Sequence, residues 1–119
     1  MANLDIDFTI ETTDAFSDSP NTFINVSFLP RTSNDSVLKR VNLAANTEKL
    51  IFSNSEYGKS YLYLKNMGSE NIDIQATGGS TVYASLAELE FAFIPWNGTL
   101  DLYAESSANN IVEVGIFEV

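Results

Sequence analysis

The side chains best suited to chemistry in this sequence are carboxylates, because its 119 residues include no histidine and no cysteine. A glycoside hydrolase needs two carboxylates flanking the scissile bond, about 5 or 6.5–9.5 Å apart. Acids in the second half could supply such a pair: Glu88, Glu90, Asp101, Glu105 and Glu113. Acids at this density are typical of a solvent-facing surface, and the chain is short for a substrate cleft. We therefore expect no catalytic residues and no enzyme.

Asp5 and Asp7 lie two residues apart, so on a strand they would share a face on which a divalent cation could bridge them. Calcium prefers six or more oxygen ligands, and no loop of spaced ligands follows. The missing cysteine and histidine remove thiolate sites and the commonest metal ligand. We expect no metal site and no cofactor.

Aromatic side chains are the second chemical resource. Tyr61 and Tyr63 alternate with leucines in the run YLYLK, Trp96 is the only tryptophan, and Tyr103 lies in a further apolar run. Exposed rings could stack on sugars in a carbohydrate-binding module, or they could anchor a protein interface, where Trp and Tyr are enriched. We favour the interface, and we keep the sugar-binding module as the alternative.

The formal charge of −10 argues against nucleic acid as a partner, which requires a basic patch. All six basic residues, Lys39 and Arg40 among them, lie between Arg31 and Lys65. This basic middle fits either an ordinary solvated surface or a head-to-tail contact with an acidic end of the next copy. No apolar run reaches the roughly 18 residues of a membrane span, and no secretory signal is visible at the start, so we expect no membrane partner and folding in cytoplasm.

The stretch Leu89–Ser106 predicts a β-hairpin, because Asn97-Gly98 separates two runs of β-type residues and suits a type I′ turn. Counting outward from this turn assigns one apolar face to the core, and its principal members are Phe91, Phe93, Leu100 and Leu102. Trp96 would lie on the opposite, outward face. Pro95 predicts that this strand is a sheet edge or carries a bulge.

The rest of the chain predicts further short strands separated by polar turns. Alternation indicates strands at residues 4–11, 23–29, 37–43, 61–65, 71–76 and 112–117, with Lys39 marking an edge strand or an exposed strand. We expect a loop over Thr12–Thr22 and one helical turn over Ser85–Glu88. The predicted fold is all-β: a single domain, residues 1–119, forming a two-sheet antiparallel β-sandwich that is jelly-roll-like, with an immunoglobulin-like topology as the alternative.

The run YLYLKNMGSENIDIQATGG, the Glu-Phe-x-Phe strand, the Tyr-Ala strand and the closing VEVGIFE resemble small virion structural proteins of tailed bacteriophages. These are β-sandwich proteins that decorate heads or form parts of the neck, tail or fibre attachment. The resemblance covers about Tyr61–Val119 and supplies no catalytic residues. It implies a virion protein, made in the host cytoplasm, that assembles as a homo-oligomer and on larger capsid or tail proteins. Its expected interaction residues are Tyr61, Tyr63, Trp96, Tyr103, Lys39 and Arg40.

Overall fold

The computed structural model of this chain describes the backbone of residues 2–16, 19–27, 31–33, 35–76 and 81–119, and the side chains of residues 5–10, 36–76 and 81–119. Its elements are all strands. In chain order they are β1 (Ala2–Leu4), β2 (Asp7–Phe16), β3 (Ser19–Ser27), β4 (Arg31–Ser33), β5 (Asp35–Leu43), β6 (Lys49–Phe52), β7 (Ser60–Asn66), β8 (Ile72–Gln75), β9 (Val82–Leu86), β10 (Phe91–Trp96), β11 (Leu102–Ser106) and β12 (Asn110–Glu118).

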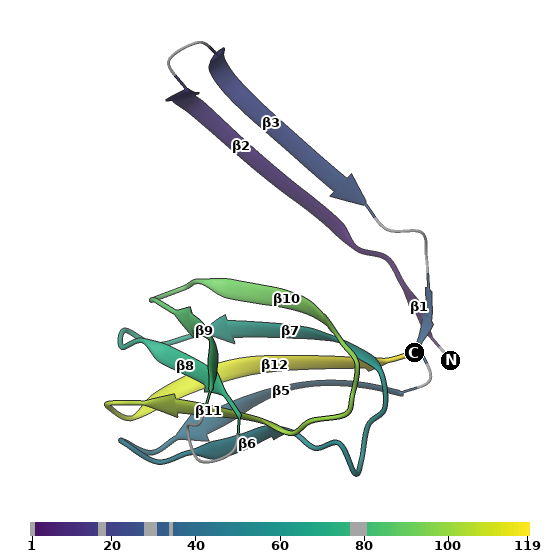
Figure 1. Cartoon of the computed structure of the whole chain (residues 1–119), viewed down its shortest axis with the longest axis vertical. Coiled ribbons are helices and arrows are strands. Elements are labelled where there is room, and N and C mark those ends of the chain that lie inside the picture. Colours follow the sequence, from purple (N-terminus) through teal and green to yellow (C-terminus); the bar gives the residue numbers. More distant parts are fainter. Residues whose placement is uncertain (1, 17–18, 28–30, 34, 77–80) are drawn as a thin grey trace.

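Strands β5 to β12 form a sandwich of two antiparallel four-stranded sheets (Figure 1). The first sheet has the order β10-β7-β12-β5, and the second has the order β6-β11-β8-β9. The first of these eight strands pairs with the last, the second with the seventh, the third with the sixth and the fourth with the fifth. This is a long antiparallel ribbon wrapped into two layers, which is a jelly roll. The predicted β-sandwich is therefore confirmed. The immunoglobulin-like alternative is wrong, because that fold keeps its first two strands in one sheet.

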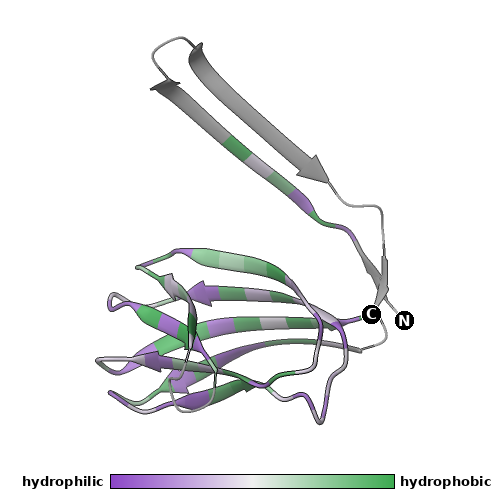
Figure 2. Ribbon diagram, in the orientation of Figure 1, coloured by the Kyte–Doolittle hydropathy of each residue, from purple (hydrophilic) through white to green (hydrophobic). Residues whose placement is uncertain are grey.

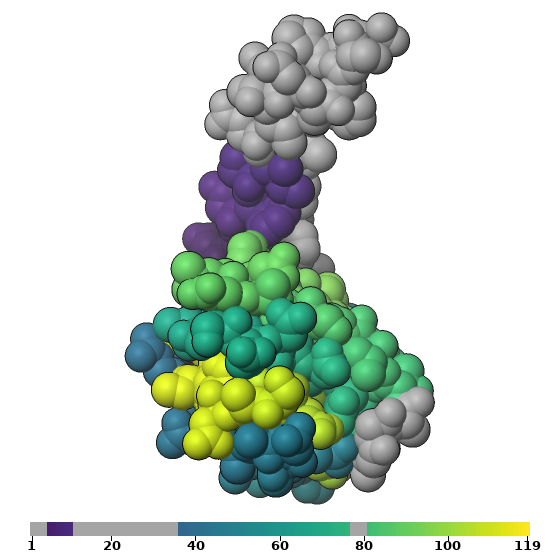
Figure 3. Space-filling model, turned by 90° about the vertical axis from the view of Figure 1, so that its left-hand side faces the viewer, coloured from purple at the N-terminus to yellow at the C-terminus, as the bar shows by residue number. Residues whose placement is uncertain are grey.

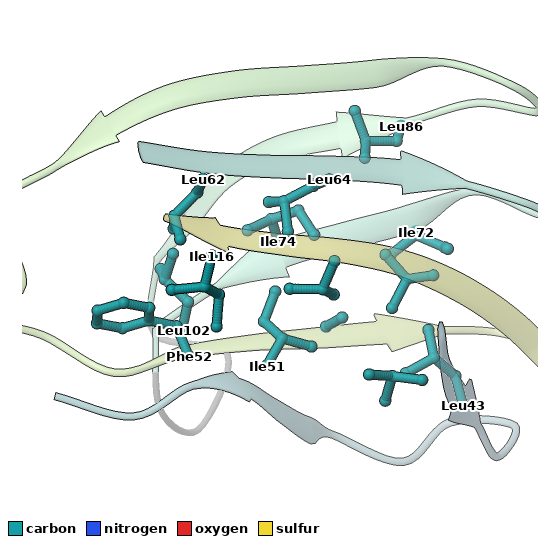
Figure 4. Packing of buried hydrophobic residues seen from close by; sticks show 14 residues of the cluster. Leu43, Ile51, Phe52, Leu62, Leu64, Ile72, Ile74, Leu86, Leu102 and Ile116 are labelled. Atoms are coloured by element: carbon teal, nitrogen blue, oxygen red, sulfur yellow. The ribbon is translucent and has the colours of Figure 1, made fainter. Parts of the chain in front are cut away.

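The core fills the space between the two sheets (Figure 4). Val112, Val114 and Ile116 alternate along the central strand β12 with residues of the outer face, and all three are fully buried. This is the alternation that the sequence predicts for a half-buried strand. The core cluster comprises Val41, Leu43, Ile51, Phe52, Leu62, Leu64, Ile72, Ile74, Leu86, Leu102, Ala104, Val112, Val114 and Ile116.

The hairpin predicted around Asn97-Gly98 is wrong, because β10 and β11 lie in different sheets. β10 pairs with β7 of the first sheet, whereas β11 pairs with β6 and β8 of the second. Asn97-Gly98 does make a turn, in which Gly98 has a φ of 81°. This turn carries the chain across the sandwich. In the wrapped ribbon only β8 and β9 are neighbours both in sequence and in a sheet, so adjacent strands usually face each other across the core.

The predicted faces of β10 are also reversed. Ala92 lies opposite the buried Leu64, and directly opposed residues share a face, so Ala92 points inward; Trp96 also packs against the core. Phe91 points outward and is 49% exposed, and Phe93, in the same row, is partly exposed. Of the four residues expected in the core, Leu102 is fully buried and Leu100 is 51% exposed.

Strands β1 to β4 form an arm that projects from the sandwich (Figure 1). β1 pairs with β4 at its base, and β2 pairs with β3 in a long antiparallel hairpin. The loop predicted over Thr12–Thr22 is therefore wrong, since β2 continues to Phe16 and β3 begins at Ser19. We name this two-stranded ribbon, β2 and β3, the arm hairpin.

Two local predictions about edges are confirmed, and one about a helix is wrong. β5, which carries Lys39, and β10, which carries Pro95, are the two edge strands of the first sheet. Ser85 and Leu86 belong to strand β9, and a turn follows them, so Ser85–Glu88 is not helical. The pairing of β9 with β8 explains this, because it satisfies the backbone hydrogen bonds of Val82–Leu86 in an extended conformation.

Candidate interaction surfaces

The outer face of the first sheet is aromatic. Tyr63 lies between Phe93 and Gly115 across the strands, and Tyr61 lies between Pro95 and Phe117. The rings of Tyr61 and Phe93 stack, with centroids 5.8 Å apart and planes 11° from parallel. We name the set Tyr61, Tyr63, Phe91, Phe93 and Phe117 the aromatic face. Figure 2 shows β10, which contributes Phe91 and Phe93, as hydrophobic over most of its length.

Gly115 lets the aromatic face close over the centre of the sheet. A Cβ at this position would lie 3.0 Å from Cε2 of Phe117 and 3.3 Å from Cβ of Tyr63. Both contacts are tighter than ordinary van der Waals packing. The ring of Phe117 and the Cβ of Tyr63 therefore occupy the space that a side chain at residue 115 would need.

The arm hairpin contacts the aromatic face at its base. The ring of Phe8, in β2, meets the ring of Phe91 edge to face, with centroids 6.0 Å apart and an interplanar angle of 69°. Figure 3 shows residues 5–10 resting on the atoms of the β10 region. Phe8 and Ile10 nevertheless remain 38% and 40% exposed. The contact holds the arm hairpin against the aromatic face but leaves apolar surface on the arm open to solvent.

Tyr63 is the most strongly constrained of the interaction residues expected from the sequence. Its hydroxyl donates to Oε1 of Glu113 at 3.0 Å, and Nε of Arg40 donates to Oε2 of the same carboxylate at 3.3 Å. Burial, the hydrogen bond to Glu113 and the negative charge of Glu113 together raise the pKa of Tyr63 above its ordinary value of 10.0. Arg40 is exposed and makes the one ion pair found in the described part of the chain. Tyr63 and Arg40 thus share a single carboxylate on the outer face.

The remaining expected interaction residues are spread over the molecule. Tyr61 is 7% exposed, on the aromatic face beneath Phe93. Trp96 packs against the core and against Tyr83, with ring centroids 5.8 Å apart, and its Nε1 donates to the carbonyl oxygen of Leu100 at 3.1 Å. Tyr103 is half-buried on the second sheet, between Leu50 and Gln75. The structure brings Tyr61 and Tyr63 together and places Trp96 and Tyr103 elsewhere.

Two lysines mark the sandwich edge that β5 and β6 form. Lys39 lies opposite the buried Val114, and Lys49 lies opposite the buried Ala104, so both occupy the inner rows of their sheets. Each is exposed because its strand is the last in its sheet. Neither forms an ion pair with any described residue. We name Lys39 and Lys49 the basic edge. The sequence reasoning singled out Lys39 but missed Lys49.

The carboxylates considered for catalysis lie apart and serve mostly as local hydrogen-bond acceptors. Asp101 accepts from the backbone nitrogen of Asn54 at 2.7 Å, and Glu90 accepts from that of Ala87 at 2.6 Å. Glu105 accepts from Nε2 of the buried Gln75 at 2.9 Å. Within the described residues, no three acids or other ligand side chains are grouped as a metal ion would require. These acids hold loops and strands in place.

Two buried amides organise the loops at the end of the sandwich opposite the arm base. The side chain of Asn66 is fully buried and donates to the carbonyl oxygens of Glu70 and Leu86 at 2.7 and 2.9 Å. Asn110 donates to the same Glu70 carbonyl at 2.7 Å. An open groove of about 630 Å³ runs past these loops. It is lined only by uncharged residues: Asn42, Leu43, Ala44, Met67, Gly68, Ser69, Asn109, Asn110 and Ile111.

The candidate surface that the sequence reasoning missed is the arm hairpin. A signal was present, because Phe8 and Ile10 alternate with polar residues in β2, and Ile24 and Val26 do so in β3. The backbone register pairs Phe8 with Val26 and Ile10 with Ile24. Reading the intervening polar residues as a loop concealed this match.

Comparison with models of known protein families finds no match to this chain, and comparison with curated proteins finds none either. Among the described residues there is no helix of the length and apolar character that crossing a membrane requires.

Proposed function

We propose that this protein is a non-enzymatic structural protein of a tailed-bacteriophage virion, which folds in the host cytoplasm and assembles with copies of itself and with capsid or tail proteins. The observation that carries the proposal is the arm hairpin. Its strands, Asp7–Phe16 and Ser19–Ser27, pair with each other and with no other strand that the structure describes.

The arm hairpin has no third strand among the strands that the structure describes. A two-stranded hairpin is at best marginally stable in water, and a third strand or a packed face is normally needed. The sandwich covers the base of the arm through Phe8 and Phe91, while Phe8 and Ile10 keep 38% and 40% of their surface exposed. An amphipathic ribbon of this kind gains stability when another molecule covers its apolar residues. Assembly into a particle supplies such a cover.

The sandwich offers further apolar surface for contacts with capsid or tail proteins. Phe91 on β10 is 49% exposed, and Leu38 on the opposite edge strand, β5, is 68% exposed. Stable interfaces bury about 1,600 Å² in total and place aromatic residues near their centres. The aromatic face has the composition of such a centre, and the arm hairpin lengthens the reach of each copy.

The alternative of a carbohydrate-binding module receives less support from the geometry. A sugar-stacking platform built from Tyr61, Tyr63 and Trp96 needs their rings exposed on one face. Tyr61 is 7% exposed beneath Phe93, and Trp96 packs against the core. The outward rings are instead engaged with one another and with Phe8.

Reconstitution tests the proposal. Particles produced without this protein are mixed with the purified chain, and binding is measured by co-sedimentation and by electron microscopy. We expect the chain to sediment with particles at a fixed stoichiometry and to form oligomers in sedimentation velocity experiments. A chain that stays monomeric at every concentration and never sediments with particles contradicts the proposal.

A further inference from the structure

We propose that copies of this chain associate head to tail, with the acidic arm hairpin of one copy lying along the basic edge of the next. This inference rests on the proposed function, because it specifies how a self-assembling protein recognises its own copies. The observations that carry it are an acidic arm and two exposed lysines at a sandwich edge that have no ion-pair partner among the described residues.

The charges of the chain are separated in space as well as in sequence. Residues 2–33, which include the arm hairpin, contain five carboxylates and one guanidinium group. Asp5 and Asp7, at the arm base, are exposed and form no ion pair with any described residue. An arm with this excess of negative charge repels other arms and the acidic remainder of the sandwich, so a basic surface is its favourable contact.

The basic edge has the complementary properties. Lys39 and Lys49 are exposed, lack an ion-pair partner among the described residues, and lie on the last strands of their sheets. A lysine on the inner row of an edge strand discourages pairing with neutral apolar strands. A strand rich in carboxylates neutralises this lysine, so the edge discriminates in favour of an acidic ribbon.

The arrangement of the two surfaces makes the contact intermolecular. The arm joins the sandwich through β4 at the start of β5, and its hairpin then passes β10 at the Phe8–Phe91 contact, whereas the rest of β5 and β6 lies on the side of the two sheets away from β10 (Figure 1). The arm and the edge of one copy therefore face different neighbours. A contact between two different surfaces is heterologous, and repeated copies of it build a ring or a filament. The exposed side chains of Ile10 and Leu38 supply apolar area to the same contact.

Charge reversal and charge exchange test this pairing. Two double variants reverse the charges: Lys39→Glu with Lys49→Glu, and separately Asp5→Lys with Asp7→Lys. Each double variant should weaken self-association by about a hundredfold. This corresponds to a tenfold loss, or about 1.4 kcal/mol, for each of its two reversed charges. Combining all four substitutions in one chain restores opposite charges across the interface. We expect this exchanged chain to recover most of the wild-type association, measured by sedimentation velocity at low salt.

Matched controls separate the pairing from a general effect of charge. Lys59→Glu and Glu88→Lys change exposed charges of the same kinds that belong to neither the basic edge nor the arm. We expect both to associate within about twofold of the wild type. Thermal unfolding of each variant, monitored by circular dichroism, should show an intact sandwich, since every substituted side chain is exposed.

Disulfide trapping gives a second measurement, which the absence of native cysteine makes clean. Ile10→Cys and Leu38→Cys are made in separate chains. On oxidation, a mixture of the two should form crosslinked dimers at least tenfold faster than either chain alone, because a heterologous contact joins unlike positions. A chain carrying both substitutions should form a ladder of covalent oligomers.

The outcomes distinguish this inference from the proposed function. Restored association in the exchanged chain, together with mixed crosslinking, supports the arm-to-edge contact. If self-association is unchanged by all four charge substitutions, or if crosslinks form only between like positions, the arm-to-edge contact is refuted. The proposed assembly function is not affected by that result. A wild-type chain that is monomeric and absent from particles overturns both.

Discussion

Gly98 has a backbone conformation and close backbone contacts that a residue with a Cβ cannot adopt without strain. We therefore expect Gly98→Ala to be strongly destabilising. Its φ of 81° lies in the left-handed region. A Cβ there would also overlap the carbonyl group of Gly58 and lie 2.8 Å from the backbone nitrogen of Lys59. These are backbone atoms of the facing loop between β6 and β7, and no rotation of a flexible side chain relieves the contact.

The magnitude follows from two costs and one gain. A non-glycine residue with left-handed φ costs about 1–2 kcal/mol. Forcing an added carbon into packed surroundings costs about 1–3 kcal/mol. Replacing glycine with alanine restricts the unfolded chain and recovers about 0.4–1 kcal/mol. We therefore expect Gly98→Ala to lower the free energy of unfolding by about 2–4 kcal/mol.

Urea denaturation followed by tryptophan fluorescence measures this loss, and Gly58→Ala is the matched control. A Cβ at Gly58 would meet only Oε2 of Glu118, at an ordinary 3.7 Å. The control should therefore match the wild type or gain up to about 1 kcal/mol.

A third variant, Gly98→Asn, separates the two costs. Asparagine tolerates a positive φ, so in an exposed hairpin turn it would replace Gly98 at little cost. Against the backbone of Gly58 it still carries a Cβ, and we expect a loss of about 1–3 kcal/mol. Unfolding free energies within about 0.5 kcal/mol of wild type for both Gly98 variants would refute the crossing turn.

Three further predictions test the core, a buried amide and an ionisable ring. Leu102→Ala should cost about 2–5 kcal/mol and Leu100→Ala about 0.5 kcal/mol or less, by urea denaturation, because the first side chain is fully buried and the second is 51% exposed. Asn66→Ala should cost about 2–4 kcal/mol in the same assay, since it leaves two carbonyl oxygens without their donor. The pKa of Tyr63 is raised in the folded protein, so the stability linked to its protonated form is fully present below pH 10.0 and is lost as pH rises through the folded value. Denaturation midpoints of Tyr63→Phe should therefore fall less steeply than those of the wild type above pH 10, whereas parallel curves would contradict this assignment.

The class of the fold could be predicted from sequence because the signals on which it rests are local. Val112, Val114 and Ile116 alternate with other residues along one strand, and all three are buried. Lys39 on a strand predicted an edge, and β5 is an edge. Such patterns report whether a residue faces a core and whether a strand has a neighbour. They were sufficient for two antiparallel layers.

Strand pairing could not be predicted in the same way. Asn97-Gly98 is a real turn, but turn chemistry does not say whether the chain returns beside itself or crosses to the other sheet. β10 adds a second ambiguity, because apolar residues occupy both its faces, with Ala92 inward and Phe91 outward. The alternation of apolar and polar residues therefore does not show which face of β10 is buried. The identity of the partner strand, β7 with its alternating Leu64 and Tyr63, decides which face is buried.

The candidate surfaces show the same division between local and non-local information. Tyr61 and Tyr63 were selected as aromatic residues alternating on one strand, and the structure places both on the aromatic face. Trp96 was selected for its residue type, yet it packs against the core because β10 is oriented opposite to the expectation. Lys49 escaped attention because its position on an edge depends on the pairing of β6 with β11. Edge positions emerge only from topology.

The two apolar faces of β10 and the arm hairpin have one explanation in common. A strand that is apolar on both sides needs cover on both sides. The core covers the inner side of β10, and Phe8 of the arm covers part of the outer side at Phe91. The described apolar side chains of the arm hairpin, Phe8 and Ile10, themselves remain 38% and 40% exposed. Under the proposed function, another molecule covers the apolar surface that Phe8 and Ile10 leave exposed, and the arm then extends the apolar contacts of β10 into the assembly.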